Sequence, residues 1–184
     1  MLLFWEHGYE STSLSQLKSR MGGISAPSFY AAFGSKETLF KEVVTRYIDT
    51  YGQALVSLWD ETLSPKEAIE LALRRSAKMQ TEGSHPLGCL LVLSASVCSP
   101  EHIHIQKMLA NAREQVRQGF VSCIQRAIDN GELAGESEPI VMATMFNSFL
   151  SGFSILAKDG VSLAVLESSI TQIMKIWDIE ASSY

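Results

Sequence analysis

Helical periodicity broken by serine, glycine and proline is the feature that most constrains the fold of this chain. Within each stretch, apolar side chains recur at spacings of three and four, and no stretch alternates polar and apolar residues as a half-buried strand does. Ser64-Pro65 and Ser99-Pro100 each place a capping hydroxyl before a proline, which a helix tolerates in its first turn. The pattern predicts an all-α protein.

The breaks also predict where each helix lies. The expected helices cover residues 13–21, 25–33, 36–61, 64–81, 88–97, 99–129, 138–158 and 162–178. The stretch 88–97 is apolar almost throughout, which predicts a buried helix. We expect two parts, a small head at residues 1–46 and a larger body at residues 47–184.

Composition favours a globular protein and argues against a disordered chain. Hydrophobic residues make up 46% of the chain and charged residues only 19%. Residues 1–46 carry five Lys or Arg and four Asp or Glu, whereas residues 47–184 carry ten and sixteen. A near-neutral head on an acidic body suits a protein that touches DNA at one end, although counts this small also arise by chance.

The sequence also indicates a compartment. The first residues lack the basic region and apolar core of a signal peptide, and no uninterrupted apolar run is long enough to cross a bilayer. Cys89, Cys98 and Cys123 are an odd number at no metal-like spacing, which fits reduced thiols. Cys98, His102 and His104 lie close together, but zinc would need a fourth ligand. We expect a cytoplasmic protein with no membrane contact, no metal and no cofactor.

The first part of the chain contains two short helices joined by a tight turn with Gly22-Gly23, which is the pattern of a helix-turn-helix. Apolar residues of the first helix can pack on those of the turn and the second helix. This small core is expected to contain Leu14, Leu17, Met21, Ile24, Phe29 and Phe33. In such motifs the second helix enters the major groove with its N-terminal part, which leaves Ser25, Ala26, Ser28 and Tyr30 facing outward.

Five short motifs follow one another in the first quarter of the chain: Gly8-Tyr9-Glu10-Ser11-Thr12-Ser13, Gly23-Ile24-Ser25, Ser28-Phe29-Tyr30, Phe33 and Ser35-Lys36-Glu37-Thr38-Leu39-Phe40. In residue type, order and spacing they closely resemble the DNA-binding head of the TetR family. The combined order is far more specific than any one motif. The resemblance implies a helix-turn-helix head followed by a helical body that dimerises and binds a ligand.

The resemblance also implies roles for individual residues. Thr12, Ser13 and Lys36 would contact phosphates at helix N-termini, and Tyr30 would contact the DNA backbone. The residues left to meet base edges and thymine methyl groups are Ser25, Ala26, Pro27 and Ser28. Capping alone explains the hydroxyl residues about as well as DNA does, because serine and threonine are ordinary helix N-caps.

The chain departs from the family pattern in two ways. Residues 21–35 contain no Arg or Lys, so specificity would rest on hydroxyl groups, thymine methyl contacts and DNA shape. Only seven residues precede Gly8, so we expect the family's basic arm and part of the head core to be missing. The alternative function is therefore a ligand-binding or protein-interaction module that has lost DNA binding.

Two apolar stripes in the last two expected helices predict a dimer interface. Their members recur at alternating steps of three and four residues, as in a heptad seam. The stripes contain Met142, Phe146, Phe149, Phe153 and Leu156, followed by Leu163, Leu166, Ile170, Ile173 and Trp177. The alternative is that both stripes are simply monomer core. We favour dimerisation because operator half-sites one helical turn apart require a two-fold protein.

A ligand pocket for a small apolar effector is expected in the body, because most ligand sites are apolar with a few polar anchors. The candidate lining residues are Trp59, Met79, Leu90, Leu93, Met108, Phe120, Phe146 and Phe149, although each of them is also a good core residue. No nucleophile–base–acid constellation, phosphate loop or carboxylate pair supports an enzyme. The sequence thus predicts a DNA-binding regulator, a ligand-released repressor that acts as a dimer on a palindromic operator.

Overall fold

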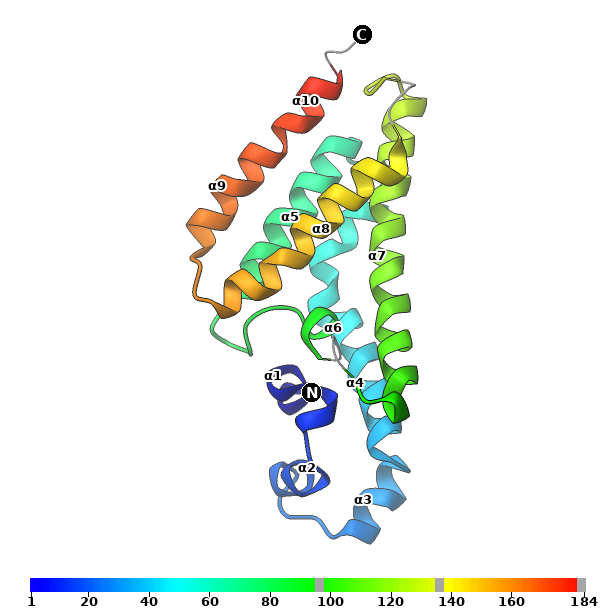
Figure 1. Ribbon diagram of the computed structural model, residues 1–184, viewed down its shortest axis with the longest axis vertical. Helices are drawn as coiled ribbons and strands as arrows, with labels where there is room; N and C mark the ends of the chain where they lie inside the picture. Colours follow the sequence, from blue (N-terminus) through cyan, green and yellow to red (C-terminus); the bar gives the residue numbers. More distant parts are fainter. Residues whose placement is uncertain (95–97, 135–137, 182–184) are drawn as a thin grey trace.

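The computed structural model of this chain describes residues 1–94, 98–134 and 138–181, and all regular structure in these ranges is helical. The prediction of an all-α protein is confirmed. In chain order the helices are α1 (Leu2–Ser11), α2 (Leu14–Arg20), α3 (Ala26–Phe33), α4 (Lys36–Thr50), the 3-10 helix η1 (Tyr51–Trp59), α5 (Pro65–Thr81), α6 (Leu90–Leu93), the 3-10 helix η2 (Pro100–His102), α7 (Ile103–Asp129), α8 (Pro139–Lys158), α9 (Leu163–Ile173) and α10 (Lys175–Ala181). The molecule is elongated, with α1 to α3 at one end and the long body helices at the other (Figure 1).

Serine side chains begin three helices of the head. Ser13 accepts a hydrogen bond from the Gln16 N–H and Ser25 accepts one from the Ser28 N–H, both at 3.2 Å. At the start of α4, Ser35 accepts one from Thr38 at 2.9 Å. These bonds satisfy amide groups that have no partner inside the helix, so the local sequence alone determines where each helix begins.

The head core is built around aromatic side chains from α1, α3 and α4. Phe4 of α1 and Phe29 of α3 are fully buried, as is Phe40 of α4. The rings of Phe4 and Phe40 meet edge to face with centroids 4.9 Å apart, which is a favourable aromatic geometry. The residues before Gly8 also contribute to this core, through the buried Phe4 and Trp5.

The body core lies between α5, α7 and α8, with α9 packed on α5. Ile69 and Leu73 of α5 are fully buried beside Phe120 of α7 and Phe153 of α8. Burial of each such side chain contributes roughly 1.5–3 kcal/mol to stability. A long α4 leads from the head toward this body (Figure 1).

The expected helices differ from the structure at several places: α1 is not among them, the helix over 99–129 begins as η2, and the helix over 162–178 is divided into α9 and α10. Two further differences are larger. The helix expected over 36–61 ends as an α-helix at Thr50, whose backbone leaves the helical region with φ −115° and ψ −81°, and continues as the tighter η1. The helix expected over 88–97 is reduced to Leu90–Leu93 within the described residues, and its positions 95–97 lie outside them. Gly88 has a φ of +81°, which an α-helix cannot contain.

The 20-residue helix α8 is long and apolar enough to cross a membrane by length and composition, with a mean hydropathy of 1.6 over its best window. The prediction concerned uninterrupted apolar runs, whereas α8 is interrupted by polar residues such as Thr144, Asn147 and Ser151. In the structure α8 packs on α5 and α7 through buried Met142, Phe146 and Phe153. A core helix of a soluble protein passes the same test.

Candidate nucleic-acid interface and body cavity

Helices α2 and α3 form a helix-turn-helix that holds the start of α3 at the surface. Consecutive left-handed residues, Gly22 with φ +81° and Gly23 with φ +76°, make the turn between them. Leu17 of α2 and Phe29 of α3 are buried together in the head core, and the half-buried Ile24 packs against them. One face of α3 is thereby fixed inward, and the opposite face is free.

The predicted base-reading residues lie on this free face. Ser25, Pro27, Ser28 and Tyr30 are exposed, the last to 50%, and Ala26 is half-buried. The hydroxyl groups of Ser25 and Ser28 are 2.8 Å apart and bonded to each other. An exposed hydroxyl pair can exchange this bond for one to DNA at little cost.

Thr12 does not lie where the resemblance implies. Its side chain is fully buried, and its hydroxyl donates to the carbonyl of Gly8 at 2.7 Å and lies 3.2 Å from that of Leu3. It ties the end of α1 together and offers no donor to a phosphate. Its neighbour Ser13 is exposed, caps α2 and forms a capping box with Gln16.

Lys36 lies half-buried at the first turn of α4. Its ammonium group is 4.4 Å from the ring centroid of Tyr9, close enough for a cation–π contact. Burial lowers the pKa of Lys36 from its usual value, and the nearby Glu10 carboxylate opposes that shift. The side chain therefore rests on the head core at the start of a helix, where its charge and free backbone N–H groups lie close together.

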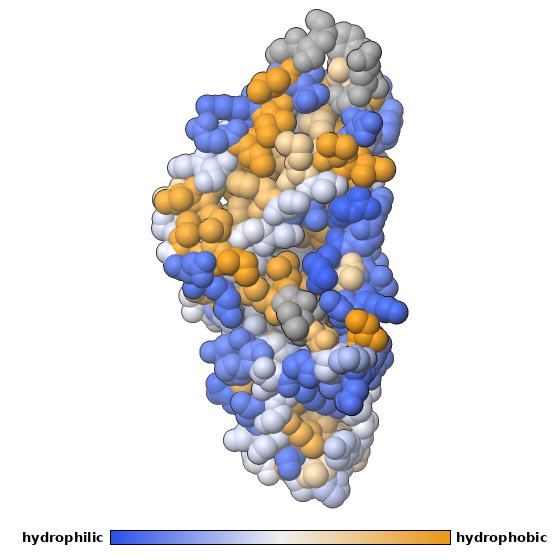
Figure 2. Space-filling model, viewed as in Figure 1, coloured by the Kyte–Doolittle hydropathy of each residue, from blue (hydrophilic) through white to orange (hydrophobic). Residues whose placement is uncertain are grey.

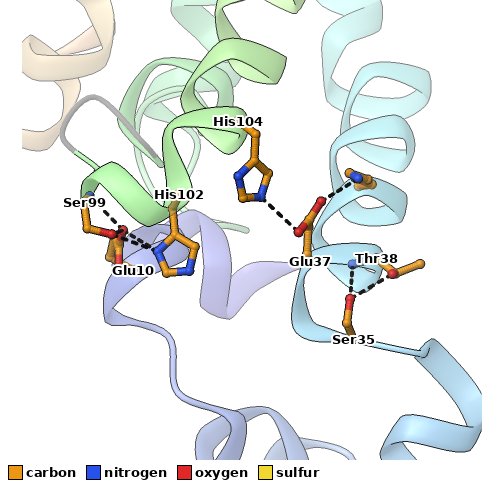
Figure 3. A network of polar contacts seen from close by, with 8 residues as sticks. Glu10, Ser35, Glu37, Thr38, Ser99, His102 and His104 are labelled. Carbon is orange, nitrogen blue, oxygen red and sulfur yellow. Dashed lines mark hydrogen bonds and ion pairs between the residues drawn. The ribbon is translucent and has the colours of Figure 1, made fainter.

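Side chains join the head to the start of α7 (Figure 3). Glu10 of α1 accepts hydrogen bonds from both the backbone N–H and the hydroxyl of Ser99, and its carboxylate lies 2.7 Å from His102 Nδ1. The Ser99 backbone donor, followed by His102 and the Ser99 hydroxyl, lowers the pKa of Glu10 to about 2. Nearby, His104 Nε2 lies 2.9 Å from Glu37 of α4. Sequence reasoning could not find these pairs, because their members are far apart in the chain.

Hydrogen bonds also hold α1 against the segment that contains α6. The Tyr9 N–H donates to the Ser94 carbonyl at 2.9 Å, and the Ser94 hydroxyl donates to the Phe4 carbonyl at 3.1 Å. The indole N–H of Trp5 donates to the Gly88 carbonyl at 3.1 Å. Both ends of α6 are therefore tied to the head.

The other side of the α6 segment faces a cavity of about 180 Å³ in the body. Helices α4, α5, α7 and α8 and the 3-10 helix η1 supply the rest of its wall. Of the eight predicted pocket residues, Trp59 and Met79 line this cavity. The half-exposed Trp59 ring lies over Gly119, where an added Cβ would be only 2.9 Å from the ring.

The other six predicted pocket residues lie outside the lining. Phe120 and Phe146 are fully buried and stack on each other in the body core, with centroids 6.4 Å apart. Leu90 is fully buried in the head core, and Met108 packs against that core. Phe149 packs on Phe153, and Leu93 lies beside Gly88. These corrections share one reason: helical periodicity identifies apolar faces but not the places where packing leaves space.

Comparisons with known proteins show which family this architecture belongs to. The sequence model described as "Bacterial regulatory proteins, tetR family" matches residues 1–43. The chain is 32% identical to the HTH-type transcriptional repressor ComR of Escherichia coli (strain K12), over 96% of this chain and 84% of that protein. The chain belongs to the TetR family. It is a transcriptional regulator and not an enzyme.

Solved structures of TetR-family proteins share the fold. The regulator CifR, solved as a cysteine mutant complexed with 26-base-pair operator DNA, is 34% identical, with a TM-score of 0.89 and coverage of 96% of this chain and 92% of that chain. The reduced form of NemR from E. coli is 22% identical with a TM-score of 0.73, which supports the fold alone. The prediction of a helix-turn-helix head on a helical body is confirmed.

In this TetR-family chain, most residues of the two predicted dimer stripes are monomer core. Buried within the chain are Met142, Phe146, Phe153, Leu166, Ile170 and Trp177, and partly buried are Phe149, Leu163 and Ile173. Only Leu156 is exposed, to 40%. Nearly all of these residues therefore contribute to the core of the monomer, which is the alternative interpretation of the two stripes.

A different set of apolar side chains faces outward from the last three helices. Figure 2 shows apolar surface over α8, α9 and α10 on the viewed face. The exposed members are Ile140, Val141, Met145, Ile155, Leu156, Val165 and Ile179. We call this set the outer face. From Pro139 to Ala157, α8 has no charged residue, so the α8 part of this face lacks the charges that keep a helix surface in water.

The cysteines do not form a reactive or metal-binding centre within the described residues. Cys89 lines the cavity and accepts a hydrogen bond from the Tyr47 hydroxyl at 3.3 Å. Burial raises the pKa of the Cys89 thiol, and the Tyr47 bond opposes this less strongly, so the thiol is protonated at neutral pH. Burial also raises the pKa of Cys123 to about 11. No group of three or more metal-ligating side chains occurs in the described parts of the chain.

Proposed function

We propose that this chain is a repressor that binds a palindromic operator as a dimer and leaves it when an effector fills the body cavity. The observation that carries the proposal is the free N-terminal face of α3, held outward because Phe29 on the opposite face is buried in the head core with Leu17. CifR, which shares the fold and 34% of its residues, was solved on operator DNA. The chain would act in the cytoplasm, where it meets DNA.

On DNA, the start of α3 would enter the major groove. Ser25 and Ser28 would offer hydroxyl groups to base edges, while Ala26 and Pro27 would contact thymine methyl groups. Tyr30 would contact the backbone. Ser13 and Lys36 would meet phosphates at the starts of α2 and α4. Because residues 21–35 carry no cation, DNA shape would supply a large part of the specificity.

The dimer would be formed by the outer face. A two-fold protein presents two identical heads to half-sites one helical turn apart, which is about 34–36 Å. The outer face is apolar and lies on α8 to α10, at the end of the molecule away from α2 and α3 (Figure 1). Dimerisation there leaves both heads free to contact DNA.

Effector and operator would be coupled through the α6 segment. One side of it, at Cys89, Leu91 and Val92, lines the cavity, and its ends at Gly88 and Ser94 are bonded to α1. A ligand that shifts this segment changes how the head is held. The ligand then favours an arrangement of the two heads that does not fit successive major grooves, which is a population shift.

The test is fluorescence anisotropy of the full chain on labelled DNA from beside its own gene, with a scrambled duplex as control. We expect specific binding that weakens steeply as salt rises. Lys36→Ala should lower affinity and reduce the salt slope by about 1, because one phosphate contact is lost. Lys78→Ala removes one exposed positive charge from the body and should leave the slope unchanged.

The proposal is wrong if, at low salt, the chain binds the DNA from beside its own gene no more tightly than the scrambled duplex. The chain would then be a binding module that has lost DNA recognition. A Lys78→Ala slope that fell as much as that of Lys36→Ala would show that overall charge, and not contact at the start of α4, governs binding.

A further inference from the structure

The body cavity has an almost uncharged wall. Arg113 of α7 is the one charged side chain among the described residues that line it. The rest of the lining is apolar or neutral, with aromatic rings from Tyr51 and Trp59. A site of this kind selects an apolar ligand, and its single charge selects the sign of the ligand's polar group.

Arg113 has no counter-ion in the described part of the chain. It is half-buried, and one guanidinium nitrogen donates to the Leu91 carbonyl. No carboxylate lies within 4 Å of it among the described residues, whereas Arg117, one turn further along α7, is paired with Glu114. A guanidinium carries five N–H donors in a planar fork that matches a carboxylate, so most of its donor capacity remains available.

Two neutral polar side chains of the wall, Gln80 and Tyr47, already have partners. Gln80 donates to the Ser76 hydroxyl and accepts from the Ser154 hydroxyl, so this buried amide is bonded at both ends. The Tyr47 hydroxyl donates to the Cys89 thiol. Arg113 is therefore the strongest donor left for a ligand. Charge-assisted hydrogen bonds are roughly twice as strong as neutral ones.

We propose that the cavity binds a small apolar monoanion, a carboxylate on an aromatic or hydrocarbon frame, with Arg113 as its anchor. The proposal rests on the proposed function, because it names the effector class of that site. The cavity of about 180 Å³ exceeds the ~150 Å³ apolar cavity that holds benzene, which leaves room for a ring and a short acid chain. A carboxylate on Arg113 competes with the Leu91 carbonyl for the guanidinium, at the segment tied to α1.

The test is isothermal titration calorimetry of the full chain with matched pairs of acid and amide. The pairs are benzoate and benzamide, 3-phenylpropanoate and 3-phenylpropanamide, and octanoate and octanamide, in which shape is kept and charge is removed. We expect the acid of at least one pair to bind about tenfold or more tightly than its amide. Arg113→Gln should reduce that preference to less than about threefold, and Arg113→Lys, which keeps the charge but loses the planar fork, should retain only part of it.

Arg117→Gln is the matched control, because it removes an arginine from the same helix outside the cavity lining. It should keep the full preference for the acid. The comparison of acid with amide in the unmodified protein needs no variant, so it stands even if Arg113→Gln does not fold. Amides that bind as tightly as acids, a preference that survives Arg113→Gln, or three pairs that do not bind at all would each overturn the proposal.

Operator release is measured separately, by anisotropy with the same compounds. An acid that binds through Arg113 but leaves the operator complex intact would confirm the ligand class and reject ligand-controlled release. Release by the neutral amides alone would leave the proposed function in place and reject the anion site. The two failures are therefore distinguishable.

Discussion

Glu10 has an unusually complete set of partners for an exposed carboxylate. Two donors from Ser99 and the ring nitrogen of His102 surround it, and together they lower its pKa to about 2. All of these partners belong to the segment that enters α7, whereas Glu10 belongs to α1. One residue thus joins the head to the body, and its charge is present at every pH at which the protein works.

Glu10→Gln should weaken folding in a way that depends on pH. The folded-state pKa lies below the ordinary value of 4.5, so the stabilising effect of the charge is present above pH 4.5 and is lost as pH falls toward 2. We expect the variant to unfold at lower urea concentration than the native chain at pH 6, and the two midpoints to converge as the pH approaches 2. Urea titrations followed by circular dichroism measure this. The exposed Glu6→Gln on the same helix is the control, and equal midpoints of Glu10→Gln and native protein at pH 6 would contradict the prediction.

Among the elements, the α6 segment is the one that local sequence describes least well. Its apolar run predicts a buried helix over 88–97, but the α-helix begins at Leu90 because Gly88 adopts a left-handed backbone. That backbone turns the Gly88 carbonyl toward the Trp5 indole, 83 residues away in the chain. Since the partner is so distant in sequence, the run's composition could not reveal the conformation.

Gly88→Ala should therefore destabilise the protein. A left-handed backbone costs a residue with Cβ roughly 1–2 kcal/mol. The added Cβ would also lie 2.6 Å from Leu93 Cδ1 and 2.8 Å from the Ser154 carbonyl oxygen. We expect the free energy of unfolding to fall by about 2 kcal/mol or more, measured by urea denaturation. Gly83→Ala, in the same loop with no atom within 4 Å of the added Cβ, should change it by less than about 0.5 kcal/mol. Equal losses in both variants would show that the loop has no special requirement at Gly88.

Sequence reasoning succeeded in the head because its determinants are local. The Ser25 side chain caps α3 by accepting from the Ser28 N–H, and Leu17 and Phe29, which lie on either side of one short turn, are buried in the same core. In α8 the same reasoning selected Met142 and Phe146, which are buried within the chain, whereas Val141 and Met145 are exposed. A helix that is apolar on all sides has more than one face that could be buried. Its sequence does not show which of these faces packs against the rest of the same chain.

At the scale of the whole molecule, the outer face lies on α8 to α10, in the half of the molecule away from α2 and α3 (Figure 1). Ile155 is 54% exposed on α8, and Val165 is equally exposed on α9. A monomer that left both in water would carry an apolar surface of the kind that marks protein interfaces. Dimerisation through this face would bury these side chains and fix the separation of two heads that do not touch each other.

Ile155→Glu should separate the dimer without unfolding the chain, because the side chain points away from the monomer core and a buried unpaired charge is costly at an interface. We expect the unmodified chain to elute as a dimer in size-exclusion chromatography with light scattering and the variant to elute as a monomer. Operator affinity should fall by about 100-fold or more, since each head would bind its half-site without the other. Ser122→Asp, which places the same charge on an exposed position of α7, should remain dimeric and bind normally. A dimeric Ile155→Glu would move the interface to another surface, whereas a monomer with undiminished operator affinity would show that a single head recognises its site alone.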